Sequence, residues 1–305
     1  MTMRSHCRWV LTGASGWFGK TALWEYERMY GPDSLRNNVI ACSSTSKPID
    51  FGSPYGPVAA ATLESIKSIN NASGLIHLAF ITRDRIAQYG VDSYISQNRA
   101  ITSLVAEFID RHPGIPVVTT SSGAASLFDS HKSSLTADPY AALKLEEEQL
   151  WQQSSSQRFA AVFRVYAATG RFIKDPSVFA LSDFLTRAMA GQRIEIRNKR
   201  PVFRSYGHVG TMMRIFWKIL DSPPAHSFLM VDAVLKKLSL LDLAKTISLM
   251  WDLPQPLYDI DYSLLPDDYT ADSSPFVDLL NSFRIDIPDF ALQLKETADY
   301  IAATS

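Results

Sequence analysis

A tyrosine and a lysine four residues apart are the pair in this sequence best suited to moving a proton. Tyr140 and Lys144 lie in the segment DPYAALKLEEEQL, where Pro139 opens a stretch with helical spacing. Residues four apart share one face of a helix, so the two side chains are expected to be neighbours. A nearby ammonium stabilises phenolate and lowers the pKa of tyrosine, which would let Tyr140 exchange a proton with an alcohol or ketone. The structural alternative is a surface pair on an amphipathic helix.

Two serines end the apolar run that precedes this helix. The run PVVTTSS is typical of a buried strand and places Ser121 and Ser122 before Gly123. Side chains at the C-terminal ends of parallel strands point into the crevice where doubly wound sheets bind ligands. Ser122 is therefore a candidate to hold a substrate oxygen against Tyr140, the alternative being that both serines only cap a turn.

The glycine-rich stretch TGASGWFG, residues 12–19, could hold phosphate. It follows a short apolar run and precedes a segment with helical spacing. In a strand-to-helix turn, Gly13 would adopt a backbone conformation denied to other residues, Gly16 would admit a pyrophosphate, and Gly19 would let the helix pack closely on the strand. A helix that begins at Gly16 would offer unpaired N–H groups and a partial positive charge to phosphate. The stretch predicts a dinucleotide-binding turn.

The residues after the second predicted strand bear on which dinucleotide would bind. The sequence IACSSTSK offers Ser43, Ser44 and Lys47 and no carboxylate. A site that prefers NAD usually has an acid here, which accepts hydrogen bonds from the adenosine ribose. Hydroxyls and an ammonium suit a 2′-phosphate better, so the sequence favours NADP over NAD. An ordinary polar loop with a solvated lysine is the alternative.

Strands and helices alternate between these features. The predicted strands cover residues 9–12, 39–42, 75–79, 116–120 and 159–165. Apolar residues three or four apart predict helices over the segments DSYISQNRAITSLVAEFIDRH and PYAALKLEEEQLWQQ. This alternation is typical of a parallel sheet covered on both faces, so we predict an α/β fold with a Rossmann-type, doubly wound sheet.

The alternation is less regular after about residue 166. Residues 177–194 and 209–220 have helical spacing, and residues 194–206 are expected to form a strand with an extended return. From residue 239 onward, helix-like runs alternate with Pro, Asp and Ser breaks. We therefore expect a smaller, mainly helical C-terminal lobe beside the sheet.

The predicted domain boundaries follow from this change in pattern. Residues 1–165 are expected to form an NAD(P)-binding Rossmann domain, to which residues 200–235 return. Residues 166–199 and 236–305 are expected to form the smaller, substrate-binding lobe.

Composition limits the other classes of function. The 305 residues include 30 Lys and Arg against 31 Asp and Glu, so the net charge of -1 gives no long-range attraction to nucleic acid or an anionic membrane. Cys7 and Cys42 do not match a zinc-binding spacing, and we expect neither a disulfide framework nor a metal site. The apolar runs are too short to span a bilayer, and the start makes a poor signal peptide, so a cytoplasmic protein is expected.

In their order along the chain, these motifs resemble the extended short-chain dehydrogenase/reductase superfamily, and specifically its NAD-dependent epimerase/dehydratase family. TGASGWFG matches the family's TGxxGxxG, and HLAF looks like its HxAA segment. FRVYAATG is similar to its RxxNVYG stretch, and FRSYGHVGTM is similar to its RDFxHVxD signature. Asn98 falls where the family has a helix asparagine that braces the active site. The resemblance covers about residues 8–220.

The resemblance implies a role for each residue of the proton-transfer group. Tyr140 would be the general acid or base, Lys144 would hold the nicotinamide ribose and tune the tyrosine, and Ser122 would bind the reacting oxygen. The nicotinamide would carry the hydride. The cofactor-binding residues are expected to be Gly13, Ser15, Gly16, Trp17, Phe18, Gly19, Ser43, Ser44, Lys47, Leu78, Ala79, Ser121, Tyr140, Lys144 and Tyr166.

Many members of the family act on nucleotide-diphosphate sugars, and two further positions concern such a substrate. Arg204 matches the arginine that contacts the diphosphate, a role that suits the planar, two-pronged guanidinium. A salt bridge that fastens the two lobes is the alternative for Arg204. Ala167 stands where the family usually has an asparagine that touches the sugar nucleotide. The expected substrate-binding residues are therefore Ser122, Ala167 and Arg204.

The residues after Ser122 narrow the reaction. Sugar 4,6-dehydratases have an Asp-Glu pair there, whereas this chain has Gly123 and Ala124. Dehydration by that route is therefore not expected, which leaves reduction of a keto group or epimerisation through a transient ketone. The loop with Ser43, Ser44 and Lys47, which favours NADP, favours the reductase.

Two alternative functions remain open for this sequence, and the resemblance implies one assembly state. The first alternative is a reductase of a small non-nucleotide ketone or alcohol, and the second is a non-catalytic dinucleotide sensor. Members of the family commonly dimerise through the two helices that here contain Asn98 and Tyr140, so a homodimer is expected.

Overall fold

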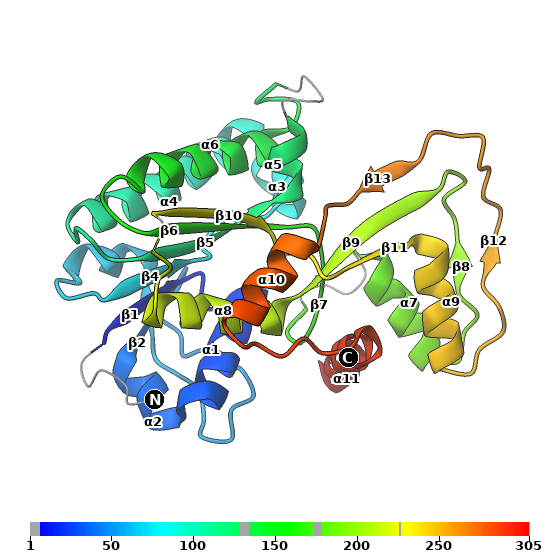
Figure 1. Cartoon of the computed structure of the whole chain (residues 1–305), viewed down its shortest axis with the longest axis horizontal. Coiled ribbons are helices and arrows are strands. Elements are labelled where there is room, and N and C mark those ends of the chain that lie inside the picture. Colours follow the sequence, from blue (N-terminus) through cyan, green and yellow to red (C-terminus); the bar gives the residue numbers. More distant parts are fainter. Residues whose placement is uncertain (1–6, 129–133, 174–178, 226, 305) are drawn as a thin grey trace. The chain divides into compact units, whose positions relative to one another are not determined.

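The computed structural model describes residues 7–128, 134–173, 179–225 and 227–304. The chain divides into two compact units (Figure 1). The first unit comprises Met1–Arg164 and Met213–Val231, and the second comprises Val165–Met212 and Asp232–Ser305. Residues 200–212, which the sequence pattern assigns to the Rossmann domain, group with the second unit.

A seven-stranded sheet forms the first unit, in the order β10-β6-β5-β4-β1-β2-β3 (Figure 1). Its strands are β1 (Trp9–Thr12), β2 (Val39–Ser43), β3 (Ala60–Thr62), β4 (Gly74–His77), β5 (Val117–Ser122), β6 (Ala160–Val165) and β10 (Phe228–Asp232). Strand β1 pairs in parallel with both β2 and β4, and the strand order proceeds outward from it in both directions. The sheet is therefore doubly wound, which confirms the predicted Rossmann-type fold.

Helices cover both faces of this sheet (Figure 1). On one face, α4 (Val91–Asp110) and α6 (Pro139–Ser154) contribute Phe108 and Trp151 to a core that also contains Val10 of β1. Because both faces are covered, β1 and β4 are buried along their whole length and largely apolar, whereas β5 begins with two valines and ends in Thr and Ser.

Two further helices cover the opposite face. These are α1 (Trp17–Tyr30) and α8 (Val209–Asp221). The side chain of Trp217 in α8 donates a hydrogen bond of 2.9 Å to the backbone carbonyl of Ala22 in α1, and this bond links the two helices. The remaining helical segments of the first unit are α2 (Pro32–Asn38), η1 (Leu63–Ser68), η2 (Arg83–Arg85), α3 (Ile86–Tyr89) and α5 (Gly123–Phe128).

Two predicted boundaries need correction. The strand expected over residues 75–79 ends at His77. The N–H of Leu78 is shared between the backbone carbonyl and the side-chain oxygen of Thr12, and the N–H of Ala79 donates to that side-chain oxygen alone. The first helix begins one residue after Gly16, which is its N-cap.

The second unit contains a small sheet centred on β9 (Val202–His208). Strand β11 (Lys236–Ser239) is antiparallel to β9, whereas β7 (Ala167–Thr169) and β13 (Asp267–Tyr269) are parallel to it. A separate parallel pair is formed by β8 (Glu195–Ile196) and β12 (Leu257–Tyr258). The sequence pattern predicts a strand near β9, but not the partners that complete its sheet.

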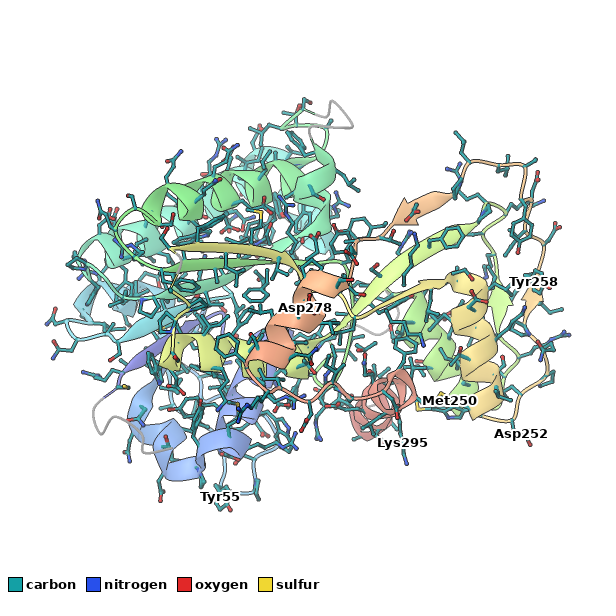
Figure 2. The ribbon with its side chains drawn as sticks, viewed as in Figure 1. Tyr55, Met250, Asp252, Tyr258, Asp278 and Lys295 are labelled. Carbon is teal, nitrogen blue, oxygen red and sulfur yellow. The ribbon has the colours of Figure 1, made fainter. Side chains whose placement is uncertain are left out.

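Four helices accompany this sheet within the described part of the second unit. They are α7 (Ala180–Met189), α9 (Leu240–Met250), α10 (Ser274–Ser282) and α11 (Phe290–Thr304). Helix α7 packs against α9 and α11, and α9 ends in a turn where Asp252 has a positive φ of 52° (Figure 2). The predicted helix over 177–194 starts outside the described residues, at 177 and 178.

The described ranges contain neither a candidate membrane-spanning helix nor a candidate metal-binding cluster. No helix there is both long enough and apolar enough to cross a membrane. No group of three or more His, Cys, Asp or Glu side chains in those ranges is placed to hold a metal ion.

Candidate active site

The glycine turn between β1 and α1 has no room for side chains at two of its three glycines. Gly13 has a φ of 68°, and a Cβ atom there would lie 2.5 Å from the backbone of Leu78. A Cβ atom at Gly19 would lie 2.2 Å from the carbonyl oxygen of Gly13. The turn therefore depends on glycine for its own folding, independently of any ligand.

The N-terminus of α1 is open to an anion. No side chain caps it, the first turn contains no acid, and both Ser15 and the N-cap Gly16 are exposed. A Cβ atom at Gly16 would meet only the carbonyl oxygen of Gly13, at 3.3 Å. Exposed N–H groups at a helix N-terminus suit a phosphate group, so this turn fits the pyrophosphate of a dinucleotide. Trp17 and Phe18 form the first turn of α1, with their rings in an edge-to-face contact.

The end of β2 supplies hydroxyls and a cation, as the sequence indicates. Ser43 is buried and donates a hydrogen bond to the backbone carbonyl of Thr45, whereas Ser44 and Lys47 are exposed. The hydroxyl of Ser43 is thus used by its own turn. Ser44 and Lys47 are the side chains available to a ligand.

Ser122 and Tyr140 converge at the C-terminal end of β5. Their hydroxyls are hydrogen-bonded, and the N–H of Ala124 donates to the Ser122 oxygen at 3.2 Å. Helix α6 begins at this point because the side chain of Asp138 accepts a hydrogen bond from the N–H of Ala141, and Pro139 occupies its first position. The predicted pairing of a strand-end serine with a tyrosine is present in the structure.

The pKa of Tyr140 is raised above its ordinary value. Burial is the main cause, because a phenolate is poorly solvated there. The hydrogen bond with Ser122 and the charge of Arg83 act in the opposite direction, whereas the charge of Glu147 raises the pKa further. In the protein alone, Tyr140 is therefore in its protonated form at neutral pH.

Lys144 is almost fully buried behind Tyr140. Its ammonium donates to the Glu147 carboxylate at 2.8 Å and to the carbonyl of Thr120 at 3.2 Å. The ammonium also lies 3.6 Å from the centre of the Phe80 ring, close enough for a cation–π contact. The same ring makes an edge-to-face contact with Tyr140, so Phe80 touches two of the three predicted catalytic side chains.

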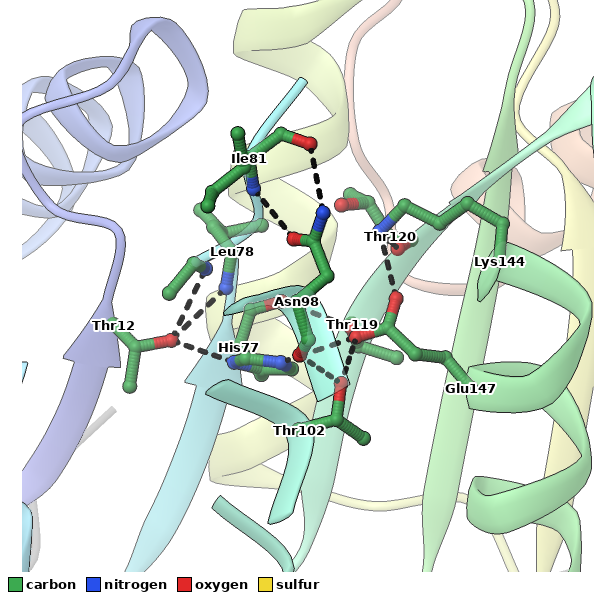
Figure 3. A network of polar contacts seen from close by, with 11 residues as sticks. Thr12, His77, Leu78, Ile81, Asn98, Thr102, Thr119, Thr120, Lys144 and Glu147 are labelled. Atoms are coloured by element: carbon green, nitrogen blue, oxygen red, sulfur yellow. Dashed lines mark hydrogen bonds and ion pairs between the residues drawn. The ribbon is translucent and has the colours of Figure 1, made fainter. Parts of the chain in front are cut away.

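The carboxylate of Glu147 is the centre of a buried polar network (Figure 3). Burial alone would raise its pKa, but the ammonium of Lys144 and the imidazole of His77 together hold that pKa at about 2. The hydroxyl of Thr102 donates a third contact to the carboxylate, at 3.1 Å.

Asn98 holds the loop that follows β4 (Figure 3). Its side-chain oxygen accepts a hydrogen bond of 2.8 Å from the N–H of Ile81, and its amide group donates to the carbonyls of Ile81 and Tyr94. This loop also contains Leu78, Ala79 and Phe80. The geometry thus gives Asn98 contacts suited to the bracing role that the family resemblance implies.

Ser121 has a feature that suits a ligand contact. Its hydroxyl is buried and makes no hydrogen bond to any other described residue. Such a group is costly unless another partner satisfies it. The Ser121 hydroxyl, which lacks a hydrogen bond to any described residue, and the glycine turn are the two features of the first unit that suit a bound dinucleotide.

Three residues near Tyr140 are missing from the sequence-based site. Phe80 and Arg83 come from the loop after β4, and the Arg83 guanidinium lies 5.1 Å from the centre of the Tyr140 ring while pairing with Asp138. No local pattern distinguishes them. The sequence does contain a signal for Glu147, because positions 140, 144 and 147 fall on one face of the predicted helix.

Tyr166, Ala167 and Arg204 belong to the second unit. Tyr166 donates to Asp232 at 3.3 Å, and Ala167 begins β7. The Arg204 guanidinium pairs with the Asp267 carboxylate at 2.7 Å and so links β9 to β13 within that unit. Their roles toward a ligand stay predictions.

Comparison with known proteins gives one sequence match. Residues 9–228 match the family model described as the NAD dependent epimerase/dehydratase family. No curated protein sequence matches the chain significantly.

Solved structures with the same fold include a nucleotide-sugar epimerase, MoeE5 and a nucleotide-sugar dehydratase. UDP-N-acetylglucosamine 4-epimerase from Methanobrevibacter ruminantium M1, in complex with UDP-N-acetylmuramic acid, is 18% identical with a TM-score of 0.73, covering 98% of this chain and 99% of its own. MoeE5 in complex with UDP-glucuronic acid and NAD is 18% identical with a TM-score of 0.72, covering 98% and 100%. A double mutant of DesIV, the dTDP-glucose 4,6-dehydratase from Streptomyces venezuelae, is 16% identical with a TM-score of 0.70, covering 97% of each chain.

Proposed function

This chain belongs to the NAD-dependent epimerase/dehydratase family, and we propose that it transfers a hydride at a secondary alcohol or ketone of a nucleotide-diphosphate sugar, as a keto-sugar reductase or an epimerase. One observation carries the proposal: Ser122, Tyr140 and Lys144 converge at the C-terminal edge of a doubly wound sheet whose first strand leads into a glycine turn. Ligands bind at that edge in sheets of this kind.

The three side chains divide the proton chemistry among them. A bound nicotinamide dinucleotide would supply or accept the hydride. Tyr140 would donate its phenolic proton to a carbonyl oxygen during reduction, or remove the hydroxyl proton during oxidation. Ser122 would hold the same oxygen, and Lys144 would stabilise the phenolate after the proton has left.

The choice between reductase and epimerase concerns the fate of the cofactor. An epimerase keeps its dinucleotide while the ketone rotates, whereas a reductase exchanges it at every turnover. The absence of an acid at the end of β2 supports NADP and the reductase, although NAD is the cofactor named with MoeE5. Gly123 and Ala124 after Ser122 do not supply the acid pair that would support dehydration.

The proposal is tested by the dinucleotide that the purified protein retains and by its turnover. We would extract and identify any bound cofactor, and then follow nicotinamide absorbance with NADPH or NADH and a panel of UDP- and dTDP-keto-sugars. Tightly retained NAD together with interconversion of UDP-hexoses identifies an epimerase. Oxidation of NADPH by a keto-sugar identifies a reductase, and no binding of either dinucleotide refutes the proposal.

Lys47 provides a test of cofactor preference. We expect Lys47→Ala to weaken NADPH binding by roughly fivefold, since an exposed ion pair with a phosphate contributes about 1 kcal/mol. NADH lacks the 2′-phosphate and serves as the control, with its affinity expected to change less than twofold. The measurement is quenching of protein fluorescence by each dinucleotide. An equal loss for both would contradict the NADP assignment.

Arg204 tests whether the substrate carries a diphosphate. We expect Arg204→Ala to weaken binding of a nucleotide sugar by at least tenfold, because a guanidinium can give two hydrogen bonds to phosphate oxygens. Asp267→Asn is the matched control: it disrupts the same ion pair but keeps the guanidinium. Calorimetric titration of both variants with UDP-hexoses separates the two roles.

A small non-nucleotide ketone is the second candidate substrate, and two observations favour it. The guanidinium of Arg204 is already paired with Asp267, and Ala167 occupies the position of the family asparagine. If Arg204→Ala leaves the affinity for every nucleotide sugar unchanged, this candidate replaces the first. Dimerisation through α4 and α6 and a cytoplasmic location stay predictions.

A further inference from the structure

The Glu147 carboxylate has polar contacts on both of its oxygens, although it is only 4% exposed (Figure 3). One oxygen accepts from Lys144 at 2.8 Å. The other accepts from Thr102 at 3.1 Å and lies 3.5 Å from the Nε2 atom of His77. Burying a carboxylate is costly unless it is paired and hydrogen-bonded, so this arrangement needs all of its partners.

The orientation of His77 follows from the contacts of Thr12. The Thr12 side-chain oxygen already accepts the N–H groups of Leu78 and Ala79, so its single proton is left for Nδ1 of His77, 2.8 Å away. Nδ1 is thus the acceptor in this bond, which leaves a ring proton to Nε2, the atom that faces Glu147. A polar chain therefore runs from the end of β1 to Lys144.

The position of Lys144 on α6 gives this chain a consequence for the proposed chemistry. Tyr140 lies one turn before Lys144 and Glu147 lies three residues after it, so the three residues fall on one face of α6, and the ring of Phe80 contacts both the ammonium and Tyr140. Glu147 anchors the ammonium, and its negative charge offsets part of the positive charge beside the phenol.

We propose that Glu147 is a positioning residue for the hydride-transfer reaction, in that its buried carboxylate fixes the Lys144 ammonium and balances its charge beside Tyr140. This inference rests on the proposed function. Glu147 touches neither substrate nor the reacting atoms in this account, and it acts only through Lys144. The effect of Glu147 in raising the pKa of Tyr140 is consistent with it.

Other groups face Tyr140 and must stay constant in a test. Arg83 lies over its ring and pairs with Asp138, and Tyr94 of α4 interacts with it electrostatically. Each of these is retained when Glu147 alone is changed. Glu146 gives a matched control, because it is the preceding carboxylate on the same helix but is half-exposed and pairs with Arg99.

The experiment is a titration of Tyr140 in the cofactor-free protein. Phenolate absorbance of the parent minus that of Tyr140→Phe isolates the one residue, and the same difference is taken in Glu147→Gln and Glu146→Gln backgrounds. We expect Glu147→Gln to lower the Tyr140 titration midpoint by roughly one pH unit, because a neighbouring carboxylate no longer opposes the phenolate. Glu146→Gln should leave the midpoint in place.

The pH profile of turnover gives a second reading of the same effect. Reduction needs the protonated phenol and is lost as the pH rises through the pKa of Tyr140, whereas oxidation needs the phenolate and is gained there. With Glu147→Gln, both limbs should move to lower pH, and the KM for the dinucleotide should rise because Lys144 loses its anchor. A purely structural glutamate would lower stability without moving either limb.

Two outcomes would overturn the inference: an unchanged Tyr140 midpoint in Glu147→Gln, or an equal shift in Glu146→Gln. If the glutamine variant does not fold, Glu147→Asp replaces it, and a smaller shift in the same direction is then expected. A shifted midpoint in a protein that binds no dinucleotide would refute the proposed function and leave the link from Glu147 to Tyr140 in place.

Discussion

Replacing Tyr140 with phenylalanine is expected to lower turnover by about 10³-fold, the usual contribution of a well-placed general acid or base. The ring would keep its contact with Phe80, and α6 would keep its Asp138 cap, so the fold should be unaffected. Dinucleotide affinity should change less than threefold, because Lys144 remains held by Glu147 and Thr120. The measurement is single-turnover nicotinamide absorbance with the substrate identified by the panel.

Tyr94→Phe is the matched control for this prediction. Tyr94 lies nearby on α4 with its ring against Phe80, and its buried hydroxyl makes no hydrogen bond to another described residue. Loss of that hydroxyl should therefore cost little in turnover. Should Tyr140→Phe work as fast as the parent protein, the catalytic assignment fails and the dinucleotide sensor becomes the better description of this chain.

Residues close together in the chain are the part of this site that a sequence predicts well. Tyr140 and Lys144 are one helical turn apart, and the helix that carries them starts at a proline with an aspartate before it. The three glycines of the first turn are similarly local, and the structure explains two of them by backbone contacts. Spacing along one element is enough to predict such positions.

Contacts between residues that are far apart in the sequence cannot be predicted from spacing along one element. Glu147 is one of three consecutive glutamates, and its burial follows from helical phase, but its contacts with His77 and Thr102 require the sheet and α4 to be in place. Arg204 pairs with Asp267, which is 63 residues away in the sequence. No property of either residue indicates the other, because tertiary packing alone brings them together.

The structure holds the residues expected to bind the cofactor differently from those expected to touch the sugar. In the first unit, backbone contacts fix the glycine turn, and the N–H of Ala124 holds the hydroxyl of Ser122. The Asp138 cap fixes the start of α6, which carries Tyr140. The positions expected to touch the sugar, Ala167 and Arg204, belong to the second unit and depart from the family pattern or are paired internally. Cofactor chemistry is therefore supported more directly than substrate identity.

Gly19→Ala is expected to have the largest effect on stability. The added Cβ atom would lie 2.2 Å from the carbonyl oxygen of Gly13 and 2.5 Å from the Cα atom of Ala14, and both neighbours are backbone that cannot rotate away. Separating α1 from the turn to relieve this contact should lower the free energy of unfolding by about 3 kcal/mol, the upper end for overpacked sites. The displaced helix N-terminus should also weaken dinucleotide binding by more than tenfold.

Gly16→Ala separates these two effects. Its Cβ atom would meet only the Gly13 oxygen, at 3.3 Å, and its φ of -76° suits alanine, so only the weaker N-cap preference, about 1 kcal/mol, should be lost. Dinucleotide affinity should nevertheless fall about as far as with Gly19→Ala, since the methyl group would stand where the pyrophosphate is expected to approach. Denaturant unfolding and fluorescence titration measure the two quantities independently. Equal stability of both variants would contradict the tight packing of the turn, and parental affinity in Gly16→Ala would remove the pyrophosphate from this helix N-terminus.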